Sequence, residues 1–337
     1  MQFALNRLDM RGPLEFAESA IEAEAQGWSM GLLPCNPLKV PDPYVCLAFA
    51  ARATEHIHLG TLLDTPVIRH PSALAGSIAT VAEFAPGRIH QGLGVGDTAV
   101  RFNGLAPAKV DAIESAVQMT RALLQGDAID VGALKPARLN HAQHVPVWVA
   151  AQGPKNLRMA GRVADGVWIR VGRDPANLNM AWDAVKHGLA DSGRAASDIQ
   201  VGLIFHTAIN SDAKAALLMA KAIAAGYYEY SKFLFDLPEL AWHGEDPHTL
   251  RGRVYPDFLH HQDMVLAGTQ VDFLPDRAAD AFALYGDWEA IASQLETTLA
   301  ASDIPAQWVL THPVLPIDSK VNYLRDAARE LLPLFAE

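Results

Sequence analysis

Prolines begin the predicted helices at several places soon after a short apolar run, and this repeated pattern constrains the fold more than any other feature of the sequence. Proline is favoured at the first position of a helix because its missing N–H would find no partner there anyway. The apolar runs have the length and composition of buried parallel strands. The prolines in this position are Pro13, Pro43, Pro71, Pro154 and Pro175. The chain is therefore expected to alternate strands and helices through short connections.

Eight apolar runs qualify as strands. They span residues 3–5, 28–33, 57–63, 88–93, 147–150, 166–169, 201–209 and 307–310. Eight strands that alternate with helices predict an α/β fold, a (β/α)8 TIM barrel, as one domain over residues 1–337. A doubly wound open sheet is the alternative, but it usually has fewer strands and would leave the last third of this chain without a role.

The segment between the last two predicted strands is too long for a simple barrel connection. Nearly 100 residues separate these strands, and the part at about 225–280 is rich in aromatic residues. We expect an insertion there, between strands seven and eight. It is either a lid beside the mouth of the barrel or a pair of helices that packs on the barrel or on a second subunit.

Composition and charge argue against several classes of protein. The formal net charge is −11, with 27 Lys and Arg against 38 Asp and Glu, which argues against a nucleic-acid partner. No apolar run reaches about 18 residues, so no membrane span is expected. The N-terminus shows no signal-peptide pattern, and two cysteines, Cys35 and Cys46, indicate no disulfide framework. These features predict a cytoplasmic protein.

Two loops after predicted strands are candidates for a ligand site, because loops at the carboxyl ends of parallel strands form the active sites of barrels. One is the bend at residues 62–66, and the other is the glycine loop at residues 94–97. Glycine has no Cβ, so a ligand can approach the backbone there; a tight turn at the barrel rim is the alternative. The residues expected to contact a ligand are Leu62, Leu63, Asp64, Gly94, Gly96, Asp97 and Thr98.

The connection after the fifth predicted strand is suited to a phosphate. Free N–H groups at a helix N-terminus, the positive end of the helix dipole and a nearby lysine all favour an anion. The candidate residues are Ala151, Gln152, Gly153, Pro154 and Lys155, with Arg170 after the next strand as a weaker second contact. A plain Gly-Pro helix start without a ligand is the alternative.

Histidines are frequent, at 13, so metal and acid–base roles need to be considered. His56 and His58 have the H-x-H spacing of metal-dependent barrel hydrolases, but they lie at the start of a strand, away from the catalytic end. We expect no catalytic metal. His70 and His206 are candidates for direct chemistry. The alternative for both is a structural role, which for His70 would be that of a helix cap.

Cys35 and Asn36 lie just after the second predicted strand. This position makes them candidates to line the cavity of a small-molecule substrate. The alternative for Cys35 is an ordinary buried cysteine.

The segments GTLLDTPVIRHP, GRIHQGLGVGDTAVR and AAQGPKNLRMAGRVADG follow one another in the chain. In this order they resemble the bacterial-luciferase-like flavin and deazaflavin oxidoreductases, and in particular the branch of methylenetetrahydromethanopterin reductase. The resemblance covers roughly residues 1–210 and 280–330. It implies a TIM barrel that binds a flavin-type ring at the bend and the glycine loop, with its phosphate at residues 151–155.

The resemblance also implies two structural details. The first is a non-proline cis peptide at the step formed by residues 62–64. The second is a homodimer, or a higher homo-oligomer, formed through helices near the second and third strands, for which the apolar stretch at residues 48–53 is suited. The chain departs from the family where Leu62 stands in place of glycine and where Asp64 and Thr65 replace other polar residues.

We expect an oxidoreductase, namely a monooxygenase that uses reduced FMN and oxygen on a small organic substrate. Because no nicotinamide-binding fingerprint is present, a separate flavin reductase would supply the reduced flavin. Hydride transfer with the deazaflavin F420 is the alternative, and its longer acidic tail would prefer more cationic groups. The cations near the phosphate loop are Lys155, Arg158, Arg170 and Arg173. A non-catalytic flavin-binding protein and a metal-dependent barrel hydrolase are further alternatives.

Overall fold

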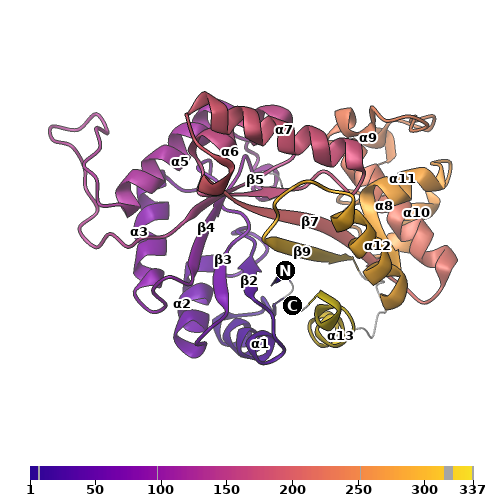
Figure 1. Ribbon diagram of the computed structural model, residues 1–337, viewed down its shortest axis with the longest axis horizontal. Coiled ribbons are helices and arrows are strands. Elements are labelled where there is room, and N and C mark those ends of the chain that lie inside the picture. Colours follow the sequence, from indigo (N-terminus) through magenta and orange to yellow (C-terminus); the bar gives the residue numbers. More distant parts are fainter. Residues whose placement is uncertain (7, 97, 251, 315–321, 336–337) are drawn as a thin grey trace. The chain divides into compact units, whose positions relative to one another are not determined.

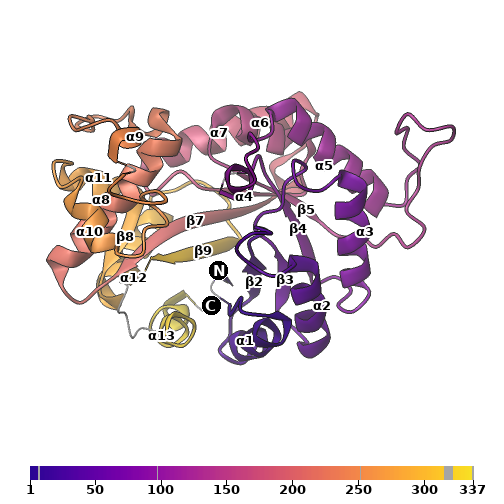
Figure 2. The same cartoon turned by 180° about the vertical axis from the view of Figure 1, so that it is seen from behind.

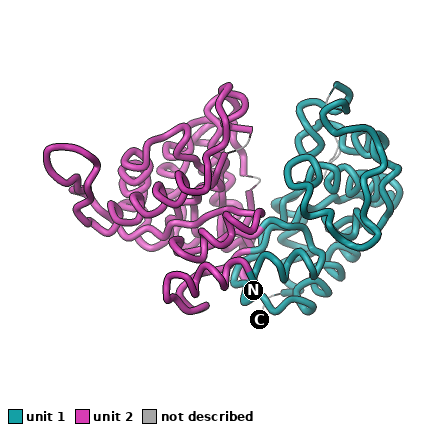
Figure 3. The backbone as a smooth tube through the Cα atoms, turned by 90° about the horizontal axis from the view of Figure 1, so that it is seen from above, with its two compact units in different colours: residues 1, 170–183, 203–337 teal, residues 2–169, 184–202 magenta. Residues whose placement is uncertain are grey.

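The computed structural model describes residues 1–337 except residues 7, 97, 251, 315–321 and 336–337. The described chain divides into two compact units (Figure 3). The first comprises residues 2–169 and 184–202, and the second comprises residue 1 with residues 170–183 and 203–337. Parallel strands alternate with helices, which confirms the predicted (β/α)8 barrel fold (Figure 1). The expectation of a single domain stays a prediction.

The first unit contains a parallel sheet in which each strand pairs with the next along the chain. Its strands are β1 (Gln2–Leu5), β2 (Met30–Leu33), β3 (His58–Thr61), β4 (Ile89–Leu93), β5 (Val147–Ala151) and β6 (Gly166–Ile169). Its helices are α1 (Pro13–Ala25), α2 (Pro43–Ala53), α3 (Pro71–Ala82), α4 (Thr98–Phe102), α5 (Val110–Leu124) and α6 (Pro154–Val163). Figures 1 and 2 show α1, α2 and α3 on the outer side of β2, β3 and β4.

The prolines begin helices as predicted. Helices α1, α2, α3, α6 and α7 (Pro175–Asp191) each have one of the five prolines as their first residue. Before α2, the Asp42 carboxylate accepts hydrogen bonds from the backbone N–H groups of Tyr44 (2.9 Å) and Val45 (3.3 Å). The proline starts of α2 and α3 and the Asp42 cap fix the directions in which the chain leaves β2 and β3. They therefore position the loops of the candidate site.

The second unit contains most of β7 (Gln200–Ile209), together with β8 (Ala283–Gly286) and β9 (Trp308–Val314). Strand β8 pairs in parallel with the end of β7, and the sequence prediction missed it because it has four residues and directly follows a helix. The helices of this unit are α8 (Ala213–Tyr230), α9 (Pro247–Leu250), α10 (Met264–Thr269), α11 (Asp276–Phe282), α12 (Trp288–Ala300) and α13 (Tyr323–Glu330). Short 3₁₀ helices are η1 (Ala196–Asp198, in the first unit), η2 (Lys232–Phe235) and η3 (Leu332–Phe335). In the described ranges, no helix combines the length and the apolar character needed to cross a bilayer.

The aromatic segment at residues 225–280 packs within the second unit. The rings of Tyr228 and Trp242 stack in parallel with their centroids 4.4 Å apart, and Phe273 meets Trp242 edge-on. On α8, the buried Lys221 ammonium pairs with the carboxylates of Asp272 (2.9 Å) and Asp276 (3.1 Å). These contacts agree with the alternative of helices packed on the fold, and a lid role stays a prediction.

Two histidines meet in the core of the first unit. Nδ1 of His58 lies 2.8 Å from Nε2 of His90, whose ring packs edge-on against Trp148. Burial, together with the smaller effect of the neighbouring His58, lowers the pKa of His90 to about 3. His58, the second histidine of the H-x-H spacing at residues 56–58, is therefore explained by its packing against His90.

This histidine pair predicts how stability depends on pH. The pKa of His90 is about 3 in the folded state, against an ordinary value of 6.5, so between these pH values the unfolded state binds more protons. The contribution of neutral His90 to the free energy of unfolding is fully present above the unfolded pKa of 6.5. As the pH falls from 6.5 towards 3, this contribution is lost by about 1.4 kcal/mol per pH unit. Urea unfolding at pH 7, 6 and 5 should show a shallower pH dependence for His90→Phe than for the wild type. Identical slopes would contradict the assignment.

Candidate active site

The bend after β3 is a bulge built around a cis peptide bond between Leu62 and Leu63, which confirms what the resemblance implied. Beyond the bulge, parallel pairing with β4 resumes at Asp64, opposite Leu93. The Asp64 N–H donates to the carbonyl of Gly92 (2.9 Å), and the Asp64 carbonyl accepts from the N–H of Gly94 (3.0 Å). The bulge thus brings the Asp64 side chain to the carboxyl ends of the strands.

The glycines beside the bulge are required by the fold itself. A Cβ added to Gly92 would lie 2.1 Å from the Thr61 carbonyl oxygen, and one added to Gly94 would lie 2.6 Å from the Leu63 side chain. Gly96 has a φ of +80°, which favours glycine. This geometry supports the tight-turn alternative, and contact with a ring stays a prediction. Thr98 begins α4, and Asp97 lies outside the described residues.

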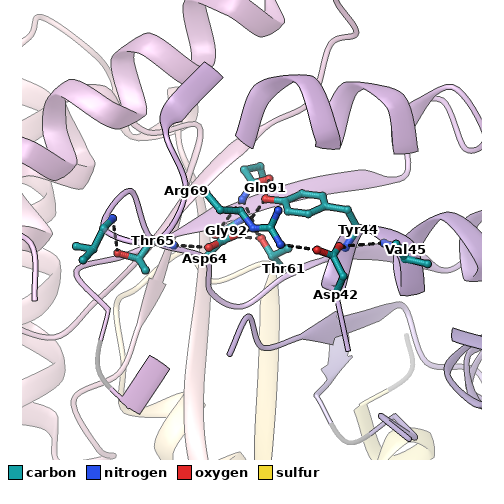
Figure 4. A network of polar contacts seen from close by, with 10 residues as sticks. Asp42, Tyr44, Val45, Thr61, Asp64, Thr65, Arg69, Gln91 and Gly92 are labelled. Carbon is teal, nitrogen blue, oxygen red and sulfur yellow. Dashed lines mark hydrogen bonds and ion pairs between the residues drawn. The ribbon is translucent and has the colours of Figure 1, made fainter. Parts of the chain in front are cut away.

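A buried polar network surrounds Asp64 (Figure 4). The Tyr44 hydroxyl lies 3.0 Å from Oδ2 of Asp64 and 3.1 Å from Oε1 of Gln91. The Gln91 amide donates to Thr61 Oγ1 (3.1 Å) and to the Gly92 carbonyl (3.3 Å). Asp64 and Gln91 are almost fully buried, and burial raises the pKa of the Asp64 carboxyl.

Arg69 links this network to the surface. Its guanidinium pairs with Asp42 (2.5 Å), and its Nε lies 3.5 Å from Oδ2 of Asp64. The same guanidinium lies over the ring of Tyr44, 5.1 Å from the centroid. Figure 4 shows Asp42, Arg69 and Asp64 in one line of contacts. The sequence interpretation did not include Asp42, Tyr44 or Arg69 among the site residues, although Arg69 lies shortly after the bend that it had singled out.

A pocket of about 160 Å³ lies beside this network. The polar residues that line it are Cys35, Asn36, Asp42, Asp64 and Arg69. The structure therefore brings the two predicted substrate residues, Cys35 and Asn36, next to Asp64 in one cavity. Leu62 and Leu63 do not line it, because Leu63 packs on the glycine loop.

The predicted phosphate loop joins β5 to α6. No side chain caps the start of α6 at Gly153, and a Cβ added to Gly153 would meet no atom within 4 Å. The buried side-chain oxygens of Gln152 and Asn156 have no hydrogen-bond partner among the described residues. Lys155 is exposed on the first turn, and Ala151 ends β5. Uncapped N–H groups, open space and an exposed lysine are what an anion site at this loop would need, whereas the two unpaired amide oxygens can only accept hydrogen bonds.

The other predicted cations have different surroundings. Arg158 pairs with Asp191 (2.6 Å), and Arg173 bonds to the Asp280 carbonyl and the Thr298 hydroxyl. Neither is therefore a free cation for a ligand. Arg170 pairs with no carboxylate within the described part of the chain.

The two predicted catalytic histidines have different roles in the structure. His70 is exposed, and its Nδ1 accepts the backbone N–H of Ser72 (3.2 Å), so it caps α3. In the second unit, Nδ1 of the buried His206 lies 3.1 Å from the Tyr227 hydroxyl, and its Nε2 lies 3.5 Å from the Arg170 guanidinium. His70 and His206 belong to different units, and their catalytic roles stay predictions. Among the described residues, no group of three His, Cys, Asp or Glu side chains is arranged to hold a metal ion.

The chain is similar to known proteins along its whole length. It is 26% identical over 362 residues to 5,10-methylenetetrahydromethanopterin reductase from Methanopyrus kandleri, covering 100% of this chain and 99% of the relative. It is 27% identical over 226 residues to F420-dependent glucose-6-phosphate dehydrogenase from Microbacterium testaceum, covering 61% of this chain and 67% of the relative. The solved structure of coenzyme F420 dependent tetrahydromethanopterin reductase from Methanopyrus kandleri has a similar fold, with a TM-score of 0.71 and 21% identity over 99% of both chains. The model of the family described as luciferase-like monooxygenase matches residues 10–303, and the protein therefore belongs to this family.

Proposed function

We propose that the protein is an oxidoreductase that uses the deazaflavin F420 to transfer hydride to or from a small organic substrate. The observation that carries this proposal is the full-length similarity to 5,10-methylenetetrahydromethanopterin reductase. The similar solved structure from the same organism and the second relative are both described as F420-dependent, which supports the choice of cofactor. This was the alternative in the sequence interpretation, and the named relatives favour it over the FMN monooxygenase.

The start of α6 fits a phosphate-bearing cofactor. The uncapped N–H groups after Gly153 and the exposed Lys155 ammonium would hold the phosphate. When bound, the reduced cofactor supplies a hydride, which is chemistry that no side chain can provide. The chain itself would position the reactants, and the bulge at Leu62–Leu63 would form the wall behind the ring.

A monooxygenase that uses reduced FMN is the second candidate, because the description of the family model that matches the chain names a monooxygenase. This candidate needs a separate reductase as a partner. The two are separated by titrating the purified protein with F420 and with FMN and following fluorescence, then measuring turnover with each reduced cofactor. Tight FMN binding without F420 binding would overturn the proposal, and binding without any turnover would support a non-catalytic flavin-binding protein.

Replacing Lys155 by alanine should weaken binding of F420 by about 1 kcal/mol, or about fivefold, because an exposed lysine makes a partly screened charge-assisted bond. Arg158→Ala is the matched control: Arg158 lies one turn further along α6, but it is paired with Asp191. Isothermal titration calorimetry on both variants gives the two affinities. Equal losses in both variants would remove Lys155 from the cofactor site.

We further propose a homodimer formed through α2. Val45 and Phe49 on this helix are 46% and 47% exposed, whereas Ala50 and Ala51 within the predicted apolar stretch face inward and are buried. Phe49→Glu should therefore convert the dimer to a monomer, because it places a charge in an apolar contact. Multi-angle light scattering at micromolar concentration measures the molar mass, and a wild-type monomer would contradict the proposed dimer.

The two buried free thiols suit a reducing compartment, which supports a cytoplasmic location.

A further inference from the structure

The network around Asp64 contains one proton fewer than its contacts need if the carboxyl is ionised. The Tyr44 hydroxyl carries a single proton, but two acceptor oxygens lie within hydrogen-bond distance of it: Oδ2 of Asp64 at 3.0 Å and Oε1 of Gln91 at 3.1 Å. A hydroxyl can donate to one of them. The second short contact needs a proton from elsewhere.

The orientation of Gln91 decides which contact receives the tyrosine proton. Nε2 of Gln91 faces the Gly92 carbonyl, which can only accept, so the nitrogen must be on that side of the amide. Thr61 Oγ1 donates its own proton to the same carbonyl (3.0 Å) and accepts from Nε2 of Gln91 (3.1 Å). Oε1 of Gln91 therefore faces Tyr44. Because Gln91 is fully buried, no solvent can replace the Tyr44 proton.

The remaining groups that face Asp64 are compatible with a neutral carboxyl. Oδ1 accepts the N–H of Thr65 at 2.7 Å, which is possible in either protonation state. The Cys35 thiol is also buried beside Asp64, and burial raises the pKa of that thiol well above its usual range, so it stays neutral. The Arg69 guanidinium is already neutralised by Asp42 at 2.5 Å, and its Nε lies further, 3.5 Å, from Asp64.

We propose that Asp64 holds a proton in the resting protein and donates it to a substrate heteroatom in the pocket lined by Cys35, Asn36 and Arg69. The side chain satisfies Tyr44 through its O–H, so that every contact in the network has a donor. Burial, which leaves Asp64 1% exposed, raises the pKa of its carboxyl in the same direction. The assignment rests on the proposed hydride-transfer function, and it defines the substrate as a small carbonyl or imine compound.

The proton and electron balance of this step is complete. With the reduced deazaflavin bound, a substrate carbon would accept two electrons and a hydrogen as hydride, and the carbon–heteroatom π bond would break. The heteroatom takes the proton of Asp64 in place of the hydrogen bond to Tyr44, and the Tyr44 hydroxyl, 3.0 Å from Oδ2, then donates to the carboxylate that is left. Nε of Arg69, 3.5 Å away, then stabilises that carboxylate, and a proton from solvent restores the acid through the pocket, at whose lining the Arg69 side chain is 29% exposed. In the reverse direction, the carboxylate accepts the proton of an alcohol or amine.

Infrared spectroscopy of the full-length protein without cofactor tests the protonation state directly. At pH 7 the wild type should show the C=O stretch of a protonated carboxyl, and Asp64→Asn should lose this band. Asp257→Asn is the matched control, because Asp257 is also buried (2% exposed) but accepts hydrogen bonds from His260 (2.8 Å) and from the Leu259 N–H. These donors hold the Asp257 carboxyl in its ionised form, which gives no acid band. The acid band should therefore persist in Asp257→Asn. Absence of the band in the wild type, or its persistence in Asp64→Asn, would overturn the proposal.

Transfer to D₂O tests whether the proton is available to the pocket. The acid band should shift to lower frequency within the mixing time, whereas a shift that takes hours would overturn the donor role. Tyr44→Phe keeps the test decisive if Asp64→Asn does not fold, because loss of the phenol should move the band without removing it, and an unmoved band would place the proton elsewhere. F420 binding is measured separately. Failure to bind F420 would remove the proposed function, whereas a missing band in a protein that binds F420 would remove only the Asp64 assignment.

Discussion

Alanine at position 92 is expected to lower the free energy of unfolding by about 3 kcal/mol and to abolish cofactor binding. The added Cβ would lie 2.1 Å from the Thr61 carbonyl oxygen and 3.1 Å from its carbon, where both neighbours are backbone atoms of β3. A backbone in the middle of a sheet cannot yield as a side chain can, so overpacking is costly there. The shift would move the bulge and with it Asp64.

Gly76→Ala provides the matched control for this experiment. Gly76 lies inside α3, and a Cβ added there would find its nearest neighbour, Leu139, at 4.0 Å. Because alanine favours helix over glycine, the control should be neutral or stabilising by up to about 1 kcal/mol. Chemical denaturation of the two variants measures both effects. Gly92→Ala with wild-type stability would mean that the bulge is not held where the structure places it.

Truncation of Trp148 to alanine should destabilise the protein by about 3–5 kcal/mol, through lost burial and the cavity left behind. The indole of Trp148 is 1% exposed and packs against the ring of Trp168, with the centroids 5.2 Å apart and the ring planes tilted by 31°. Two glycines make room for this pair: a Cβ at Gly166 or at Gly202 would lie 2.3 Å from the ring of Trp148 or Trp168, respectively. Because Gly166 and Gly202 have no side chains, they cannot fill the cavity that the truncation would leave beside them.

Trp148→Phe should lose much less stability than Trp148→Ala, because it retains an aromatic ring against Trp168. Thermal unfolding and urea unfolding of both variants compare the losses. If the two substitutions cost the same, the indole is not packed as described, and the interior of the sheet is more adaptable than the structure indicates.

Sequence patterns predicted the fold well because the fold depends on local rules. The eight predicted strands and the five proline-started helices are all present, since proline at the first helical turn and short apolar runs act within a few residues. The resemblance of three segments correctly indicated the family and the cis step between Leu62 and Leu63. For the cofactor, the sequence interpretation favoured FMN with F420 as the alternative, and the named relatives favour F420. Leu62 and Asp64 depart from the family pattern at the bend, so the resemblance alone left both cofactors open.

The sequence by itself determined the alternation of strands and helices, the carboxyl-end loops that carry a site, and the cavity residues Cys35 and Asn36. Only the tertiary structure showed that Tyr44 from α2, Asp64 from the bulge and Gln91 from β4 share one set of protons. It also showed that Gly94 accommodates Leu63 and that Arg158 is neutralised by Asp191. The physical reason is that hydrogen bonding and ion pairing depend on distances of about 3 Å between residues 20 to 47 positions apart in this network, and one-dimensional periodicity carries no information on such distances.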